Sequence, residues 1–140
     1  MNFMEESTNY PAIQFRIARP TNNLEEIIAF YTKGLGLKIV YEFKGHQGYD
    51  GVMIGLPGMQ YHLEFTRTGL QVQSKAPTRD HLLVLYFKEI KDLDKIRERL
   101  NSLGYQPVAP ENPYWADKSW TYEDPDGWRV VLYNGLFSGY

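Results

Sequence analysis

The chain has 140 residues, with 15 basic and 17 acidic side chains spread along it and no cysteine. This length is typical of one globular domain, so we expect residues 1–140 to form a single unit. The near balance of charge gives no electrostatic reason to expect nucleic acid or an anionic membrane as a partner. The lack of cysteine excludes disulfides, thiolate catalysis and cysteine-ligated zinc.

Targeting and catalytic motifs are also missing from the sequence. No apolar run is long enough to cross a bilayer, and the opening "MNFMEESTNYP" lacks the basic and apolar regions of a secretion signal. The sequence therefore predicts a cytoplasmic protein. A phosphate-binding glycine loop, an HExxH motif and a nucleophile elbow are absent, which disfavours nucleotide-binding and hydrolase functions.

The first half of the chain, about residues 11–68, combines one helix pattern with four strand patterns. Apolar and polar residues alternate from Ile13, as in a half-buried strand, until Pro20. A period of 3.6 residues then begins at Leu24 and predicts a helix that ends near Gly34. Three further strands are expected in "LKIVYEF", "YDGVMIGLP" and "QYHLEFTRT".

The second half, about residues 80–136, repeats this order after a polar connection at about residues 69–79. A strand in "HLLVLYF" precedes a helix from about Lys91 to Leu103, and strands are expected in "YQPVA", "KSWTYE" and "WRVVLY". A duplicated βαβββ unit is the simplest explanation. We therefore predict an α+β fold in which two modules form an open, curved antiparallel sheet around a ligand cleft.

Strand alternation divides the side chains into two faces. The face toward the helices should be the apolar one, with Ile13, Phe15, Ile17, Tyr61, Leu63, Phe65, Leu82, Val84, Tyr86, Trp128, Val130 and Leu132. The opposite face mixes charged, polar and apolar groups, as ligand clefts do, and holds Gln14, Arg16, Ala18, His62, Glu64, Thr66, His81, Leu83, Leu85, Arg129, Val131 and Tyr133.

Several segments resemble the vicinal oxygen chelate superfamily, which includes glyoxalase I, fosfomycin-resistance enzymes, extradiol dioxygenases and bleomycin-resistance proteins. The resemblance extends over roughly residues 11–134 and lies in "FRIARPTNNLEEIIAFYTKGLGLKIVYE", "HLEFTRTG", "DHLLVLYF" and "DPDGWRVVLYN". It implies the two-module fold, a cleft for a small-molecule ligand and a homodimer. Symmetric pairing is also the commonest soluble assembly.

The resemblance also implies where a metal ion would bind. Carried over strand by strand, the four ligand positions of the metal-dependent members correspond to Gln14, Glu64, His81 and Val131. Valine has no lone pair to donate, and an amide oxygen such as that of Gln14 is a weak ligand for a transition metal. The expected carboxylate is thus missing from the last strand, although His62 could partly compensate.

Two functions follow from this resemblance, and a third possibility is a domain that has lost its chemistry and serves only in protein interaction. The first is a glyoxalase-like or bleomycin-resistance-like protein that binds a small molecule without a metal or other cofactor. In that case Arg16 or Arg129 would pair with Glu64, or would bind an anionic ligand. The alternative is a metal-dependent lyase, isomerase or thiol transferase that uses one Zn, Ni, Mn or Fe ion, held by Glu64 and His81 with Gln14 or His62.

Aromatic side chains are further candidates for ligand contacts. Trp120 and Tyr122 share one face of their strand, and we place both in the cleft, where their rings could stack on a planar or cationic ligand. Tyr114 and Trp115 belong to a loop that could fold over the cleft. Packing between modules or subunits is the alternative explanation for these rings.

Overall fold

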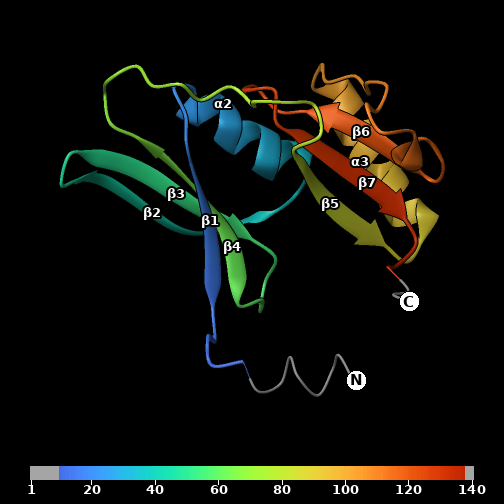
Figure 1. Cartoon of the computed structure of the whole chain (residues 1–140), viewed down its shortest axis with the longest axis horizontal. Coiled ribbons are helices and arrows are strands. Elements are labelled where there is room, and N and C mark those ends of the chain that lie inside the picture. The colour runs from blue at the N-terminus through green and yellow to red at the C-terminus, as the bar shows by residue number, and fades with distance from the viewer. Residues whose placement is uncertain (1–9, 138–140) are drawn as a thin grey trace.

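In the computed structural model, which describes residues 10–137, each half of the chain forms its own sheet (Figure 1). The first sheet has the strand order β1-β4-β3-β2 and comprises β1 (Phe15–Pro20), β2 (Lys38–His46), β3 (Tyr49–Gly55) and β4 (Tyr61–Arg67). The second has the order β5-β7-β6 and comprises β5 (Leu82–Phe87), β6 (Ser119–Glu123) and β7 (Arg129–Asn134). The predicted α+β architecture with two related modules is confirmed.

Both sheets are mixed, whereas the sequence predicted antiparallel ones. β1 pairs in parallel with β4, and β5 pairs in parallel with β7, while the remaining neighbours are antiparallel. A parallel pair requires a crossover, and in each module a helix lies in the chain between the two parallel strands. The segment "YQPVA" forms no strand beyond one bridge between Val108 and Thr121. Pro107 lies beside that bridge and has no N–H to donate to a ladder.

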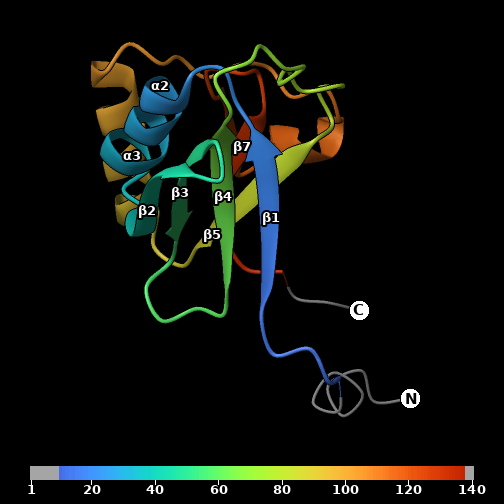
Figure 2. The same cartoon turned by 90° about the vertical axis from the view of Figure 1, so that its left-hand side faces the viewer.

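The helices of the two modules lie together on one side of the strands (Figure 2). α2 (Leu24–Ala29) continues as one π-helical turn (Phe30–Gly34), and α3 (Ile90–Ser102) is the helix of the second module. Figure 2 shows α2 and α3 on the same side of the strands. They share one core with both sheets, formed by Leu24, Ile27, Phe30, Tyr31, Leu35, Leu37, Val52, Ile54, Phe65, Leu93, Leu100, Tyr122, Val130 and Leu132. None of the helices described within residues 10–137 is long and apolar enough to cross a membrane.

The face assignment of β5 was wrong by one residue. Leu83 and Leu85 pack against the core, where Leu82, Val84 and Tyr86 had been expected. The register of β5 with β7 places Leu82 beside Arg129 and Val84 beside Val131, on the opposite face. Because "LLVLYF" is apolar on both faces, its alternation contains no information that fixes the register.

The "DPDG" turn before β7 holds the two modules together. Asp126 accepts hydrogen bonds from the hydroxyl of Thr21 at 2.6 Å and from the amide of Asn23 at 3.0 Å. Asp124 accepts a hydrogen bond from the hydroxyl of Tyr31 at 2.8 Å. Both carboxylates are buried, so these bonds satisfy groups that water does not reach.

Candidate functional site

A cluster of three side chains lies on the polar face of the first sheet. Parallel pairing sets Arg16 opposite His62 and Ala18 opposite Glu64, so all of these residues share one face. The Nε–H of Arg16 donates to Nε2 of His62 at 3.1 Å, and Nη1 of Arg16 lies 3.6 Å from Oε2 of Glu64. The side chain of Glu64 is 14% exposed and that of Arg16 is 43% exposed. A guanidinium that remains partly open to solvent thus neutralises a largely covered carboxylate.

The residues predicted to bind a metal ion are not brought together. Gln14 lies four residues before the partner of Glu64 on β1, about 13 Å along the strand, and its amide donates to Oε1 of Gln60 at 3.2 Å. His81 belongs to the second module, where Nδ1 lies 2.8 Å from the hydroxyl oxygen of Thr78.

The donor set therefore does not fit a metal centre. Within residues 10–137, no three histidine, aspartate or glutamate side chains are grouped so that they could hold an ion. The guanidinium of Arg16 donates a hydrogen bond to Nε2 of His62 and forms an ion pair with Glu64, so neither group is free to bind a metal ion. The side chain of Val131 has no atom that could bind a metal ion.

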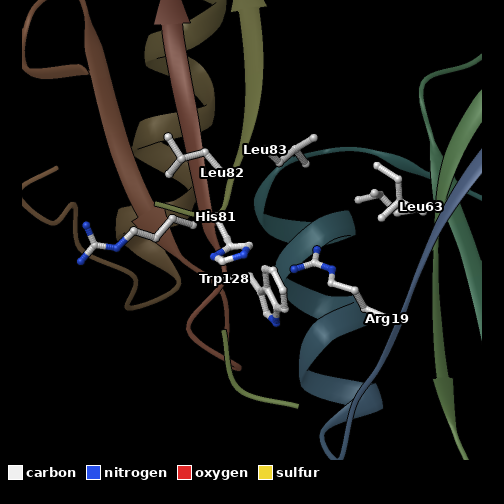
Figure 3. Close-up of a pocket in the computed structure, with 8 residues that line it drawn as sticks. Arg19, Leu63, His81, Leu82, Leu83 and Trp128 are labelled. Atoms are coloured by element: carbon white, nitrogen blue, oxygen red, sulfur yellow. The ribbon is translucent and has the colours of Figure 1, made fainter. Parts of the chain in front are cut away.

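A cavity of about 150 Å³ lies where the two modules meet (Figure 3). His81 and Trp128 enter it from the second module and Arg19 from the first, and the three side chains point toward one another. The guanidinium carbon of Arg19 lies 4.5 Å from the centre of the Trp128 ring, and the rings of His81 and Trp128 meet edge to face at 5.3 Å. The remaining lining residues are Ile17, Leu63, Leu82, Leu83 and Arg129. The cavity thus combines apolar walls with the nitrogen-bearing side chains of Arg19, His81 and Arg129.

Arg19 is also part of the contact between the modules. Its Nη2 donates to the hydroxyl of Tyr31 at 3.1 Å, and its Nη1 lies 3.9 Å from Oδ2 of Asp124. Burial raises the pKa of Asp124 above its ordinary value, although Tyr31 and Arg19 act in the opposite direction. Burial likewise raises the pKa of the Tyr31 hydroxyl, which keeps it protonated as a donor. Arg19 therefore both lines the cavity and stabilises the carboxylate behind it.

In the second sheet, the face that corresponds to the polar face of the first sheet is covered by other parts of the protein. Arg129 is only 5% exposed, and its guanidinium donates to Glu123 and to the backbone oxygen of Ala109, each at 3.0 Å. Val131 is fully buried on the same face. Trp115 packs edge to face on Tyr133 at 5.9 Å. The loop that contains Trp115 therefore covers part of this face, and Arg129 binds within the chain.

The placement of Trp120 and Tyr122 in the cleft was wrong. The hydroxyl of Tyr122 donates to Asn101 of α3 at 2.9 Å, and Tyr122 is fully buried. The guanidinium of Arg97, also on α3, lies 4.1 Å from the centre of the Trp120 ring. Both rings thus face the helix, because β6 pairs Trp120 with Leu132 and Tyr122 with Val130, which belong to the core.

Sequence reasoning missed Arg19 and Trp128 as cavity residues. Trp128 was assigned to the helix-facing side of its strand, and we expected the ligand cleft on the opposite side. The cavity, however, is lined by Trp128. Arg19 follows Phe15 and Ile17 on the apolar face of β1. A charged residue at a core-facing position was the available signal, since such residues are rarely buried without a partner.

Comparison with known proteins identifies both halves of the chain. Residues 15–66 match the YycE-like N-terminal domain, and residues 80–134 match the YycE-like C-terminal domain. A relative from Bacillus subtilis, the uncharacterized protein YycE, is 50% identical over 127 residues, which cover 91% of each chain.

Solved structures share the fold. A crystal structure of a YycE protein of unknown function from Bacillus subtilis, described as a candidate glyoxalase or fosfomycin resistance protein, matches with a TM-score of 0.88 at 49% identity, over 95% of this chain and 98% of that one. The antibiotic-binding protein TnmS3 from Streptomyces matches at 0.64 and 19% identity, over 89% of this chain and 97% of that one. The fosfomycin resistance protein FosX from Mesorhizobium loti matches at 0.66 and 13% identity, over 92% and 95% of the two chains. The chain belongs to the YycE-like family, within the vicinal oxygen chelate superfamily.

Proposed function

We propose that this protein binds a small organic molecule without the help of a metal ion. The observation that supports this proposal is the position of Arg16, which contacts both His62 and Glu64. A guanidinium there supplies the positive charge that metal-dependent members of the superfamily obtain from an ion. The fold is also that of TnmS3, an antibiotic-binding protein, although the low identity restricts this likeness to the fold.

Two surfaces supply contacts for the proposed ligand. The partly exposed guanidinium of Arg16 can bind a carboxylate or another oxyanion. His81, Trp128 and Arg19 offer aromatic and hydrogen-bonding groups in the cavity between the modules. At about 150 Å³ this cavity is smaller than a typical ligand pocket of roughly 300–1,000 Å³, so it suits one ring or side group of a ligand.

Calorimetric titration tests the proposal directly. The metal-stripped protein, its Glu64→Ala variant and its His81→Ala variant are titrated with Zn²⁺, Ni²⁺, Mn²⁺ and Fe²⁺. We expect that no metal ion binds in a way that both substitutions abolish, since within residues 10–137 neither side chain belongs to a group of three metal-ligating side chains. Tight one-to-one binding that both substitutions remove would overturn the metal-free proposal in favour of the metal-dependent lyase, isomerase or thiol transferase.

A screen of organic molecules then tests binding itself. Thermal shifts are measured for the wild type and for His81→Ala, with Arg79→Ala as a control. Arg79 is 69% exposed and does not line the cavity. The proposal requires ligands whose shift is lost in His81→Ala and kept in Arg79→Ala. The proposal would be contradicted if no molecule in the library raised the melting temperature of the wild type, or if every molecule that did so raised that of His81→Ala equally.

We also propose that the protein is a homodimer. The edge strand β1 and the residues before it expose a row of apolar side chains, with Ile13 at 87%, Phe15 at 61% and Ile17 at 52%. Exposed apolar rows of this kind mark association surfaces, and an unpaired strand edge favours pairing with another chain. Light scattering should give a dimer for the wild type and a monomer for Phe15→Glu. A wild-type monomer at micromolar concentration would contradict this.

A further inference from the structure

A hollow of about 420 Å³ between the π-helical turn and α3 gathers basic side chains. Lys33, Lys38, Lys95 and Arg99 line it, against a single acid, Asp92. The protein as a whole has a formal net charge of −2, so this surface differs in sign from the molecule around it. None of the four basic side chains takes part in an ion pair within residues 10–137.

Arg99 is held in place at one end of this hollow. Its Nε–H donates to the backbone oxygen of Gly34 at 3.0 Å, while neither terminal nitrogen has a hydrogen-bond partner among the described residues. A Cβ atom at Gly36 would collide with Nη2 of Arg99. Gly36 thus allows the guanidinium to lie close to the backbone with its terminal N–H groups available for an oxyanion.

Helix ends explain only part of this charge. Basic residues often neutralise the last carbonyl groups of a helix, and Lys33 and Arg99 lie in such last turns. Lys38, however, is the first residue of β2, and Lys95 lies in the middle of α3. Lys95 and Arg99 are four residues apart on α3, a spacing at which like charges destabilise a helix. An anionic ligand would relieve this repulsion.

The basic hollow adjoins an apolar one of about 440 Å³. Leu35, Gly36 and Ile96 line both spaces. The apolar hollow continues between the modules along Leu37, Leu56, Met59, Tyr61, Val84, Leu85, Tyr86 and Phe87. Met59 is 50% exposed and Tyr86 is 42% exposed. A cationic space and an apolar space therefore share one boundary, on residues separate from Arg16 and His81.

We propose that these two hollows form one binding site for a soluble amphiphile with an anionic phosphate or carboxylate head. The head binds Lys38, Lys95 and Arg99, and the apolar body lies against Met59, Tyr86 and Phe87. Each hollow has the volume of a small-molecule pocket. The net negative charge of the protein opposes adsorption to an anionic bilayer, which favours a single dissolved molecule over a membrane surface.

Calorimetry with octyl phosphate, kept as a monomer in solution, tests this site. Inorganic phosphate supplies the head alone, and 1-octanol supplies the body alone. We expect one octyl phosphate per chain and at least about tenfold weaker binding of either fragment, because each loses one of the two sets of contacts. Equal affinity for octyl phosphate and inorganic phosphate would overturn the amphiphile assignment.

Substitutions separate the two ends of the site. Lys38→Gln combined with Lys95→Gln should weaken octyl phosphate binding about tenfold or more, and Met59→Asp should do the same from the apolar end. Lys44→Gln is the charge-matched control, because Lys44 lies six residues further along β2, roughly 20 Å away. Leu70→Asp is the apolar control, since Leu70 is 76% exposed and lines neither hollow.

Three results would overturn the proposal. The first is no binding of octyl phosphate, and the second is binding that the substitutions in the site leave unchanged. The third is binding to phosphatidylglycerol vesicles without binding of the monomeric probe, which would identify a membrane surface. The variants Glu64→Ala and His81→Ala should bind octyl phosphate normally, so a failure here is distinct from a failure of the function proposed above.

Discussion

The hydroxyl of Tyr31 donates a hydrogen bond of 2.8 Å to Oδ2 of Asp124, and this bond joins the helix of one module to the turn of the other. Both residues are buried, and Asp124 also accepts the backbone N–H groups of Asp126 and Trp128 at 2.8 and 3.0 Å. The carboxylate is thereby surrounded by donors from two distant parts of the chain.

Tyr31→Phe should lower the free energy of unfolding by about 1–3 kcal/mol, because the buried Asp124 loses a donor while the ring keeps its volume. Urea denaturation followed by circular dichroism measures this change. Tyr114→Phe is the matched control, since Tyr114 is 65% exposed, and it should have no effect beyond error. Equal effects of the two substitutions would show that the bond to Asp124 contributes nothing.

The pH dependence of stability should reveal the burial of Asp124. Burial raises the pKa of this carboxyl in the folded protein above its ordinary value of 3.8, so the folded state binds the proton more tightly than the unfolded state does. Its contribution therefore makes the protein more stable as the pH falls from the raised pKa toward 3.8. Above that window the ionised buried carboxylate lowers stability.

The comparison with Asp124→Asn isolates this contribution, because other titrating groups are common to both proteins. Denaturation at pH steps from neutral to acidic should show the wild type gaining stability relative to the variant on acidification. A constant difference, or one that changes in the opposite direction, would contradict the raised pKa.

Gly36→Ala should destabilise the protein more than Gly104→Ala does. Both glycines have positive φ, +82° and +96°, so alanine costs about 1–2 kcal/mol of backbone strain at either position. Only at Gly36 would the new Cβ also collide with Arg99, whereas at Gly104 no described atom outside the adjacent residues would lie within 4 Å of it. Adding Arg99→Gln to Gly36→Ala should restore part of the loss. Denaturant midpoints are measured for the wild type, Gly36→Ala, Gly104→Ala and the double variant Gly36→Ala/Arg99→Gln. Equal losses of stability in the two single variants would show that the collision with Arg99 has no effect.

Thr121→Val should stabilise the protein by about 1 kcal/mol. The hydroxyl of Thr121 is buried and has no hydrogen-bond partner among residues 10–137, and valine has nearly the same shape. Thr32→Val should have the opposite effect, since its hydroxyl donates to the backbone oxygen of Ile28 at 2.6 Å. Scanning calorimetry compares the two variants, and a lower melting temperature for Thr121→Val would be the contrary result.

Arg16→Ala should raise the affinity for Ni²⁺ while leaving stability within about 1 kcal/mol, because a partly exposed ion pair contributes little to folding. The substitution frees Nε2 of His62 and the carboxylate of Glu64, two metal-ligating groups on one face. Calorimetric titration of Arg16→Ala and of Arg16→Ala/Glu64→Ala separates this effect from adventitious binding. If both variants bind Ni²⁺ equally, Glu64 is not a ligand that Arg16 masks.

How far the sequence predicts this fold depends on the contrast between the two faces of each strand. In β1, Arg16 shares a face with His62, as alternation predicts, and the helix that follows also agrees with its prediction. Ile17, which alternation assigned to the buried helix side, is 52% exposed and lies outside the core. In β5 every residue from Leu82 to Phe87 is apolar, so the packing of Leu83 and Leu85 against the core depends on the pairing with β7. A pattern without contrast cannot specify register.

The candidate site could be predicted only in part, for a related reason. Arg16, His62 and Glu64 share a face, as alternation predicts, because they lie on paired strands of one module. Residues whose positions depend on contacts between the modules, or on the pairing register of a strand, escaped prediction. Arg19, Tyr31 and Asp124 meet only when the two halves pack, and Trp120 and Tyr122 face α3 through the register of β6.

The bonds from the "DPDG" turn to the first module also limit the order in which this protein can fold. The hydrogen-bonded pairs Tyr31–Asp124, Asn23–Asp126 and Thr21–Asp126 are 93, 103 and 105 positions apart in the chain. Contacts this distant in sequence close large loops and slow the search for the native state. During synthesis the first module emerges from the ribosome with the partners of Tyr31 and Thr21 still unmade. Final consolidation of the core therefore waits for the last strand, and a nascent chain that stalls before Asp124 should be a substrate for chaperones.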